Sequence, residues 1–302
     1  MNNQTEARPV IVGEVLFDCF PDGSVVMGGA PLNVAWHLHG FGADPLLISR
    51  LGTDDNGQAV IDKMTAWGLD LTGIQRDTEH PTGRVEVSLN DEGQPEFSIV
   101  PDQAYDFIDA DEAERIVASR AVALLYHGSL AVRNPTSRQA LMRLRRQYSD
   151  RIFVDINLRA PWWDEALVDE LVNGARWLKL NDVELSRLSD NSKRPQEEQA
   201  RDYAGKYDLQ QLILTLGDKG ACLVETDTII RGEPVAVTRI ADTVGAGDAF
   251  SAVTILGILK NWPSTDIMPR ALEFAALLCT VRGATLPDRD IYRNLLEKWG
   301  AA

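Results

Sequence analysis

A short run of small residues stands beside a carboxylate in the last fifth of the chain. Gly245, Ala246 and Gly247 precede Asp248, and the apolar spacing from Phe250 onward predicts a helix. Backbone N–H groups at a helix start lack an intrahelical partner, so they can hold an anion. A carboxylate beside them can take the proton of a hydroxyl group that attacks this anion. These groups together have the chemistry that phosphoryl transfer requires.

The same stretch also has a purely structural interpretation. A Gly-rich turn that leads into a helix with an acidic first turn is a common capping pattern, so capping and catalysis both stay open here. The stretch is no Walker loop, because Gly-Lys-Ser or Gly-Lys-Thr does not follow. An NAD-linked oxidoreductase is disfavoured, because no G-x-G-x-x-G follows the first predicted strand.

Other polar residues stand where predicted strands end, which is where parallel α/β sheets bind ligands. Asp18 and Asn33, with Gly28 and Gly29 between them, could grip hydroxyl groups, because Asp accepts and Asn both donates and accepts. Arg159 could clamp a phosphate group. A turn for Asp18, a helix cap for Asn33 and a surface ion pair for Arg159 remain the alternatives.

Two later stretches have the residue types of a nucleotide site. Asn181 follows a strand and opens a helix, and Glu184 could hold a hydrated Mg²⁺ through water. A simple capping pattern explains this pair equally well. Thr215, Gly217 and Gly220 lie on a tight turn after the next strand, which suits a backbone close to a nucleotide. A plain hairpin turn is the alternative.

The hydrophobic pattern predicts an α/β fold. After Asp106, short apolar strands alternate with helical stretches, which indicates a parallel sheet covered by helices. Residues 81–101 instead alternate with period two and turn at residues 90–93, as in an antiparallel hairpin. Residues 15–27 contain two more short strands. These two segments do not fit the strand–helix alternation, so they predict a small separate sheet.

Composition limits the classes of partner. The chain has 302 residues, 44% apolar and 25% charged, which is enough to form a large core. Its net charge of −15 argues against nucleic acid or an anionic membrane as a partner. The three cysteines are scattered, the start lacks the layout of a signal peptide, and no apolar run reaches membrane-spanning length. We therefore expect a cytoplasmic protein.

These stretches, in this order, resemble the ribokinase-like (phosphofructokinase-B type) carbohydrate kinases over nearly the whole chain. The specific matches are Gly-Gly-Ala-Pro-Leu-Asn-Val-Ala at 28–35 and Asp-Thr-Val-Gly-Ala-Gly-Asp at 242–248. The stretches at 181–184 and 215–220 match intermediate motifs. The resemblance implies one domain over 1–302, a three-layer α/β/α fold with a mostly parallel central sheet. It also implies a small β-sheet lid over the sugar, formed by about 15–27 and 81–101.

The resemblance also implies a role for each matching residue. Asp248 would be the catalytic base, and Gly245, Ala246 and Gly247 would form the anion hole. The implied sugar and phosphoryl contacts are Asp18, Gly28, Gly29, Asn33 and Arg159. The implied ATP contacts are Asn181, Thr215, Gly217 and Gly220. Glu184 would serve Mg²⁺, and the carbonyls of Asp242 and Val244 would hold a monovalent cation, K⁺, as in some relatives.

Within this family the chain looks most like bacterial fructokinases, on Gly13 to Asp18 and on Asp155-x-Asn157-x-Arg159. This likeness implies transfer of the ATP γ-phosphoryl group to a free sugar, most readily fructose. Family members that act on phosphorylated sugars tend to carry a Lys after the paired glycines, where this chain has Ala30 and Pro31. Another polyol, such as 2-keto-3-deoxygluconate or an aminoimidazole riboside, and a non-catalytic sugar or nucleotide sensor remain the alternatives.

Two physical expectations complete the sequence-based hypothesis. The helix dipole and backbone amides should favour the charged form of Asp248 and keep its pKa low. The alternating apolar residues of the lid strands would form a poorly buried sheet unless its outer face is covered. The sequence therefore predicts a homodimer joined through the lids.

Overall fold

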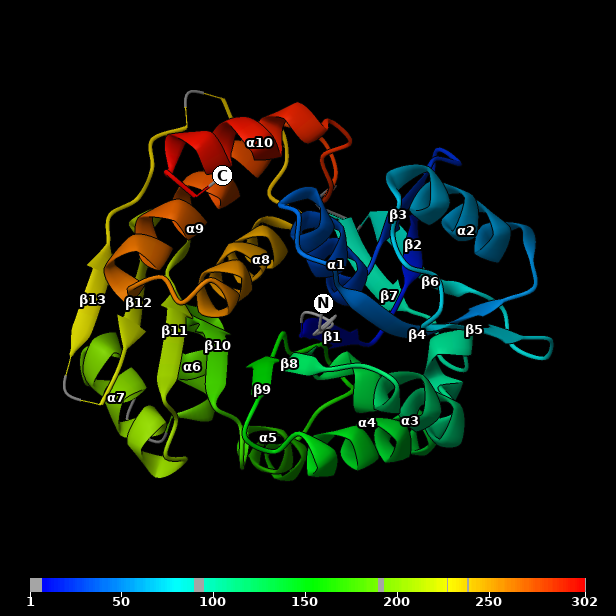
Figure 1. Ribbon diagram of the computed structural model, residues 1–302, viewed down its shortest axis with the longest axis horizontal. Coiled ribbons are helices and arrows are strands. Elements are labelled where there is room, and N and C mark those ends of the chain that lie inside the picture. The colour runs from blue at the N-terminus through cyan, green and yellow to red at the C-terminus, as the bar shows by residue number, and fades with distance from the viewer. Residues whose placement is uncertain (1–6, 90–94, 190–192, 227, 238, 302) are drawn as a thin grey trace, which may run out of the picture.

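The structure is a computed structural model, and it describes residues 7–89, 95–189, 193–226, 228–237 and 239–301. The turn predicted at residues 90–93 lies outside these described residues. Two sheets organise the described chain (Figure 1). The larger sheet carries the helices on both faces, and the smaller one stands beside it.

The larger sheet has the strand order β13-β12-β11-β10-β9-β8-β1-β4-β5. Strands β11 to β5 in this order are all parallel, whereas β12 runs antiparallel to both of its neighbours, β11 and β13. Its strands are β1 (Arg8–Val12), β4 (Leu46–Gly52), β5 (Ile74–Asp77), β8 (Val122–His127), β9 (Ile152–Asp155), β10 (Trp177–Asn181), β11 (Gln211–Thr215), β12 (Ala221–Val224) and β13 (Ile229–Gly232). This architecture confirms the predicted mostly parallel sheet.

Successive residues of the buried strands point to opposite faces, and each face has its own apolar core. In β1, Ile11 joins one core, while Val10 and Val12 join the other. The first core is covered by α1 (Ala30–Gly40), α2 (Asp55–Trp67), α8 (Ala246–Leu259), α9 (Ser264–Leu278) and α10 (Arg289–Lys298). The second is covered by α3 (Ala110–Ala118), α4 (Pro135–Gln147), α5 (Glu165–Val172), α6 (Asp182–Leu188) and α7 (Gln196–Lys206). The fold is therefore a three-layer α/β/α arrangement.

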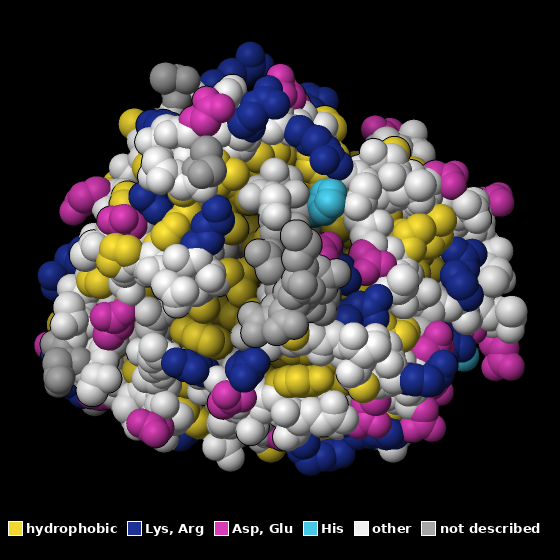
Figure 2. Space-filling view, viewed as in Figure 1, with side chains coloured by type: hydrophobic (Ala, Val, Ile, Leu, Met, Phe, Trp, Pro, Cys, Tyr) yellow, Lys and Arg dark blue, Asp and Glu magenta, His cyan; other side chains and the backbone are white. Residues whose placement is uncertain are grey.

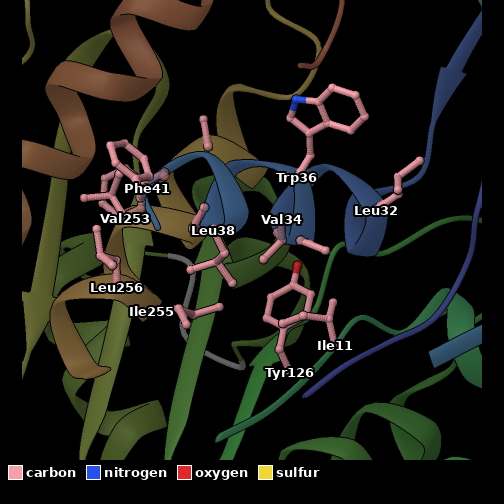
Figure 3. Close-up of a cluster of buried hydrophobic side chains, with 14 of the residues drawn as sticks. Ile11, Leu32, Val34, Trp36, Leu38, Phe41, Tyr126, Val253, Ile255 and Leu256 are labelled. Atoms are coloured by element: carbon pink, nitrogen blue, oxygen red, sulfur yellow. The ribbon is translucent and has the colours of Figure 1, made fainter. Parts of the chain in front are cut away.

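Helices α1 and α8 pack against each other over the middle of the sheet (Figure 3). Leu38 of α1 and Ile255 of α8 lie in one apolar cluster with Ile11 and Tyr126 of the sheet. Residues 249–257 of α8 are all buried, as expected for a helix that is apolar on every side. Its large apolar side chains, such as Phe250, Ile255 and Leu256, each contribute about 1.5–3 kcal/mol when fully buried. This packing fixes the position of the first turn of α8.

The smaller sheet has the strand order β3-β2-β6-β7 and confirms the separate sheet predicted from the sequence. Its strands are β2 (Leu16–Cys19), β3 (Val25–Gly28), β6 (Gly83–Leu89) and β7 (Pro95–Ile99). Strands β6 and β7 form the predicted antiparallel hairpin, and β6 also pairs with β2 in parallel. The small sheet thus joins two segments that are far apart in the sequence.

The carboxyl-terminal half contains elements that the sequence reading did not identify. Strands β12 and β13 extend the sheet in antiparallel fashion, and the turn between β11 and β12 is a hairpin with a short 3₁₀ helix, η3 (Gly217–Lys219). The other 3₁₀ helices are η1 (Ala104–Phe107) and η2 (Leu130–Val132). In the part of the chain that the structure describes, no helix is both long and apolar enough to cross a membrane.

Candidate active site

The first turn of α8 presents unpartnered backbone amides. Gly245 caps this helix with φ of 79°, and a Cβ atom there would lie 2.5 Å from the Cβ of Ala284, so only Gly fits. No side chain of the described residues caps α8. The amide of Ala246 donates to the carbonyl of Thr243 at 3.3 Å, so of the predicted anion hole Gly247 keeps a free amide among the described residues, and the amide of Asp248 stands free beside it.

Asp248 meets Asn33 of α1 at this helix start. The Nδ2 of Asn33 donates a hydrogen bond of 2.8 Å to Oδ2 of Asp248. The Asn33 side chain is only 4% exposed, and its Oδ1 has no hydrogen-bond partner among the described residues. Two predicted site residues that are 215 positions apart in the sequence therefore come together. The free Oδ1 can accept a hydrogen bond from a bound hydroxyl group.

The expected low pKa of Asp248 is wrong. Desolvation by the surrounding protein raises the pKa of Asp248 to about 6. The hydrogen bond from Asn33 opposes this shift, and the carboxylate of Asp155 adds to it. Lys179 and Arg159 lower the pKa less. Desolvation thus raises the pKa of Asp248 by more than the amides at the helix start lower it, and Asp248 is a stronger base than the sequence suggested.

Asp18 and the paired glycines lie on the small sheet and at its junction with α1. A Cβ atom at Gly28 would lie 3.6 Å from Oδ2 of Asp18. Gly29 has φ of 108°, and a Cβ atom there would lie 2.6 Å from the carbonyl oxygen of Glu14. The pair therefore lets the start of α1 approach both Asp18 and the chain after β1, and contact of these glycines with substrate stays a prediction.

Arg159 is exposed on the loop after β9 and faces several carboxylates. Its charge lowers the pKa of Asp18, Glu14 and Asp248, although burial raises the pKa of all three overall. Asp242 acts on Asp18 in the opposite direction to Arg159. The predicted residues Asp18, Arg159, Asp242 and Asp248 are thus close enough to interact electrostatically. They share one acidic site, to which Arg159 supplies an exposed guanidinium.

Glu14 is a buried carboxyl group that the sequence reading used only as part of a motif. Its side chain is 4% exposed, and Oε2 has no hydrogen-bond partner in the described part of the chain. Burial, together with the charge of Asp248, raises the pKa of Glu14 to about 7. The signal was available, because Glu14 stands between the apolar runs 10–12 and 15–17, and a carboxylate is seldom fully buried.

The predicted nucleotide residues stand at the ends of neighbouring strands. Asn181 of β10 pairs in register with Thr215 of β11. Gly217 is exposed on the hairpin turn, with φ of 61°. Gly220 is buried, and a Cβ atom there would lie 2.1 Å from the carbonyl oxygen of Gly232. Gly217 is thus free to approach a nucleotide, whereas the packing of the β11–β12 hairpin explains Gly220.

The capping interpretation of the Asn181 motif is confirmed. Oδ1 of Asn181 accepts from the amide of Glu184 at 2.9 Å, and Oε2 of Glu184 accepts from the amide of Asn181 at 2.9 Å. Oε1 of Glu184 accepts from the amide of Leu158 at 2.8 Å, and the side chain is only 6% exposed. Direct coordination of Mg²⁺ by Glu184 does not fit this arrangement. A contact through water stays a prediction.

Asp242 uses its carboxylate to join two loops. Its Oδ1 accepts from the amide of Val244 at 3.0 Å, and its Oδ2 accepts from the amide of Gly283 at 3.2 Å. The carbonyls of Asp242 and Val244 therefore lie on a loop tied to residues 279–283. Within the described residues, no three or more His, Cys, Asp or Glu side chains are grouped to hold a metal ion.

Comparison with known proteins agrees with this geometry. The profile of the pfkB family of carbohydrate kinases matches residues 20–291. A sugar kinase of Pyrococcus horikoshii is 31% identical over 77% of this chain and 73% of its own. The Escherichia coli fructokinase is 28% identical over 94% of this chain and 97% of its own.

Solved structures show the same fold. A double mutant of the Vibrio cholerae fructokinase, with fructose, ADP and potassium ion bound, has a TM-score of 0.80 and 25% identity. The match covers 96% of this chain and 98% of that one. The resemblance recognised in the motifs is thereby confirmed over the whole fold. The chain belongs to the pfkB family of carbohydrate kinases, and it is a phosphotransferase that acts on a sugar hydroxyl group.

Proposed function

We propose that this protein transfers the γ-phosphoryl group of ATP to a hydroxyl group of free fructose. The observation that carries the proposal is the contact between Asn33 and Asp248 beside the free amides of α8. Asn33 can orient the sugar through Oδ1 while Nδ2 holds the carboxylate. Asp248 then takes the hydroxyl proton as the oxygen attacks the γ-phosphorus. The amides of Gly247 and Asp248 stabilise the charge on the transferred group.

Fructose is favoured over other acceptors by the similarity to fructokinases and by the chemistry of the sugar side. Asp18 and Asn33 suit hydroxyl groups, and Arg159 supplies positive charge for the transferred phosphoryl. A coupled assay of ADP formation across a panel of free sugars tests the assignment. Faster turnover of 2-keto-3-deoxygluconate or an aminoimidazole riboside would reassign the acceptor. ATP and sugar binding without any turnover would identify a sensor instead.

The proposal includes ATP at Asn181, Thr215 and Gly217, and Mg²⁺ carried with its phosphates. The metal would neutralise phosphate charge, and it keeps most of its waters, so it needs few protein carboxylates. Glu184 would orient one of these waters. A K⁺ ion at the carbonyls of Asp242 and Val244 is supported by the potassium ion bound in the Vibrio cholerae structure. Comparing rates in potassium and tetramethylammonium salts tests that site.

The charge pattern supports small-molecule substrates in the cytoplasm. The chain carries a net charge of −15. On the face shown in Figure 2, Lys and Arg side chains are scattered among Asp and Glu rather than gathered in one field. A field of positive charge would be needed to neutralise nucleic acid phosphates or anionic lipids.

The raised pKa of Asp248 predicts an acid limb in the pH profile. Asp248 accepts a proton only when it is ionised, so kcat/KM should fall about tenfold per pH unit below about pH 6. Initial rates between about pH 5 and pH 8, at subsaturating sugar, measure this limb. A profile that stays flat through this range would contradict the assignment of Asp248 as the base.

A homodimer joined through the small sheets is also part of the proposal. Val25 and Phe97, on strands of this sheet, are 54% and 55% exposed, which is high for large apolar side chains. Light scattering at micromolar concentration should report a dimer, and Phe97→Glu should shift it toward monomer. Val235→Glu changes an exposed apolar residue outside both sheets and serves as the control. A monomeric parent protein would exclude this dimer.

A further inference from the structure

A buried ion pair lies behind the first turn of α8. Lys179 and Asp155 are 6% and 2% exposed, and they are direct neighbours on the parallel strands β10 and β9. The Nζ of Lys179 donates to Oδ1 of Asp155 at 2.9 Å and to Oδ2 at 2.8 Å. Both residues lie in strands that are otherwise apolar, so each charge depends on the other for compensation.

Asp155 also connects the pair to α8 and to β8. Oδ2 of Asp155 lies 2.7 Å from the Oγ of Ser251, which belongs to the second turn of α8, and 3.3 Å from the hydroxyl oxygen of Tyr126. Ser251 and Tyr126 are fully buried. The carboxylate is thus fixed from three sides, and its position relative to α8 cannot vary freely.

The ammonium of Lys179 approaches the helix start itself. A Cβ atom at Gly247 would lie only 3.5 Å from the Nζ of Lys179. Gly247 supplies one of the free amides of the anion hole, and Asp248 follows it directly. Two opposite charges therefore stand just behind the residues that we assign to phosphoryl transfer.

We propose that Lys179 and Asp155 are positioning residues, whose opposite charges behind the first turn of α8 set how readily Asp248 accepts the proton. This inference rests on the proposed role of Asp248 as the base. Asp155 makes proton uptake by Asp248 easier, and Lys179 makes it harder. Because the two charges act on Asp248 in opposite directions, loss of both should shift its proton uptake less than loss of one, which leaves the other charge uncompensated.

Other groups also act on Asp248 and must stay constant in a test. Asn33 on α1 donates a hydrogen bond to it, Arg159 on the loop after β9 lowers its pKa, and Glu14 after β1 is a further acid that interacts with it. None of these groups belongs to the ion pair. Substitutions at positions 155 and 179 leave all three side chains in place.

A purely structural ion pair makes a different prediction from a positioning pair. If the pair only stabilises the fold, loss of either charge should lower activity in the same way, in proportion to the loss of folded protein. If it acts on Asp248, the two single substitutions should shift the acid limb of kcat/KM in opposite directions. The sign of the shift therefore separates the two roles.

The experiment compares Asp155→Asn, Lys179→Met and the double variant in the full-length enzyme, with the sugar that the parent turns over. Asp155→Asn should move the acid limb down by about one pH unit, and Lys179→Met should move it up by about one. The double variant should return the limb toward the parent position. The matched controls are Arg8→Gln and Asp70→Asn, which each break an ion pair near the amino end of β1. Neither control should move the acid limb of kcat/KM.

The outcomes are distinguishable from failure of the proposed function. Full turnover by Asp248→Asn would remove the base assignment itself, whatever the pair does. Loss of turnover in Asp248→Asn, with an unmoved limb in Asp155→Asn, would overturn only the role of the pair. If Lys179→Met does not fold, the other two variants still test the role of the pair. Asp155→Asn must shift the acid limb of kcat/KM, and the double variant must return it toward the parent position.

Discussion

Replacing Asp248 with Asn is expected to lower kcat by about 10²–10⁴ while ATP binding survives. The substitution removes the proton acceptor but keeps the shape of the side chain and its neighbour Asn33. The residual rate should come from the free amides of α8, which still hold the phosphoryl group. A coupled assay measures kcat, and calorimetric titration with ATP measures binding.

The thermal stability of the Asp248→Asn variant shows whether a loss of activity comes from a loss of folding. The pKa of Asp248 is raised in the folded protein, so its ionisation is easier in the unfolded chain. The stability that protonated Asp248 contributes is present at low pH and is lost as pH rises through about 6. At pH 8 a neutral Asn avoids this loss, so the variant should melt no lower than the parent. Near-normal turnover in a folded variant would remove Asp248 from the mechanism.

Free fructose should be turned over, and fructose 6-phosphate should be disfavoured by at least about two orders of magnitude in kcat/KM. Burying a second phosphate group without fixed cations is costly. The sugar side has Glu14, Asp18 and Asp248 as acids, and the exposed guanidinium of Arg159 faces them. Arg133 also acts on Glu14, but its side chain is buried and already paired with Asp106 at 2.7 Å. The start of α1, where family members that act on phosphorylated sugars tend to carry a Lys, has Ala30 instead.

The small sheet offers no compensating charge. In the described part of residues 82–101 the only basic side chain is Arg84, which is 51% exposed and lies 3.3 Å from Glu86. Two of the acidic residues expected there, at positions 91 and 92, lie outside the described residues. ADP formation with each sugar at matched concentrations measures the preference. Comparable rates would place this protein with the phosphofructokinases of its family.

The sequence was sufficient where function depends on short, ordered motifs. The start of α8 and the capping pair Asn181 and Glu184 follow local rules, because helix starts need particular residues at particular positions. Asn33 does not cap α1, as the alternative reading of the sequence had it, because Gly29 is the N-cap and no side chain caps this helix. The small sheet was predictable because its period-two pattern differs from the rest of the chain.

The electrostatics of the site were not predictable in the same way. The pKa of Asp248 depends on desolvation and on Asp155, which is 93 positions away in the sequence. A prediction from the local helix start alone therefore had the pKa shift in the wrong direction. Lys179 was missed, although a lone cation inside the apolar run Leu178-Lys179-Leu180 marks a charge that must find a buried partner. Strands β12 and β13 were missed because they break the parallel alternation.

The contact between Asn33 and Asp248 also constrains how the protein is made. All nine strands of the larger sheet are complete at Gly232, whereas α8 begins at Ala246. A growing chain therefore contains the complete sheet before the helix that covers its centre has been synthesised. Until α8, α9 and α10 arrive, the apolar face that includes Ile11 and Tyr126 is covered only in part, by α1 and α2, and exposed apolar surface favours aggregation. Activity and protection of the core thus arise in the same late step of synthesis.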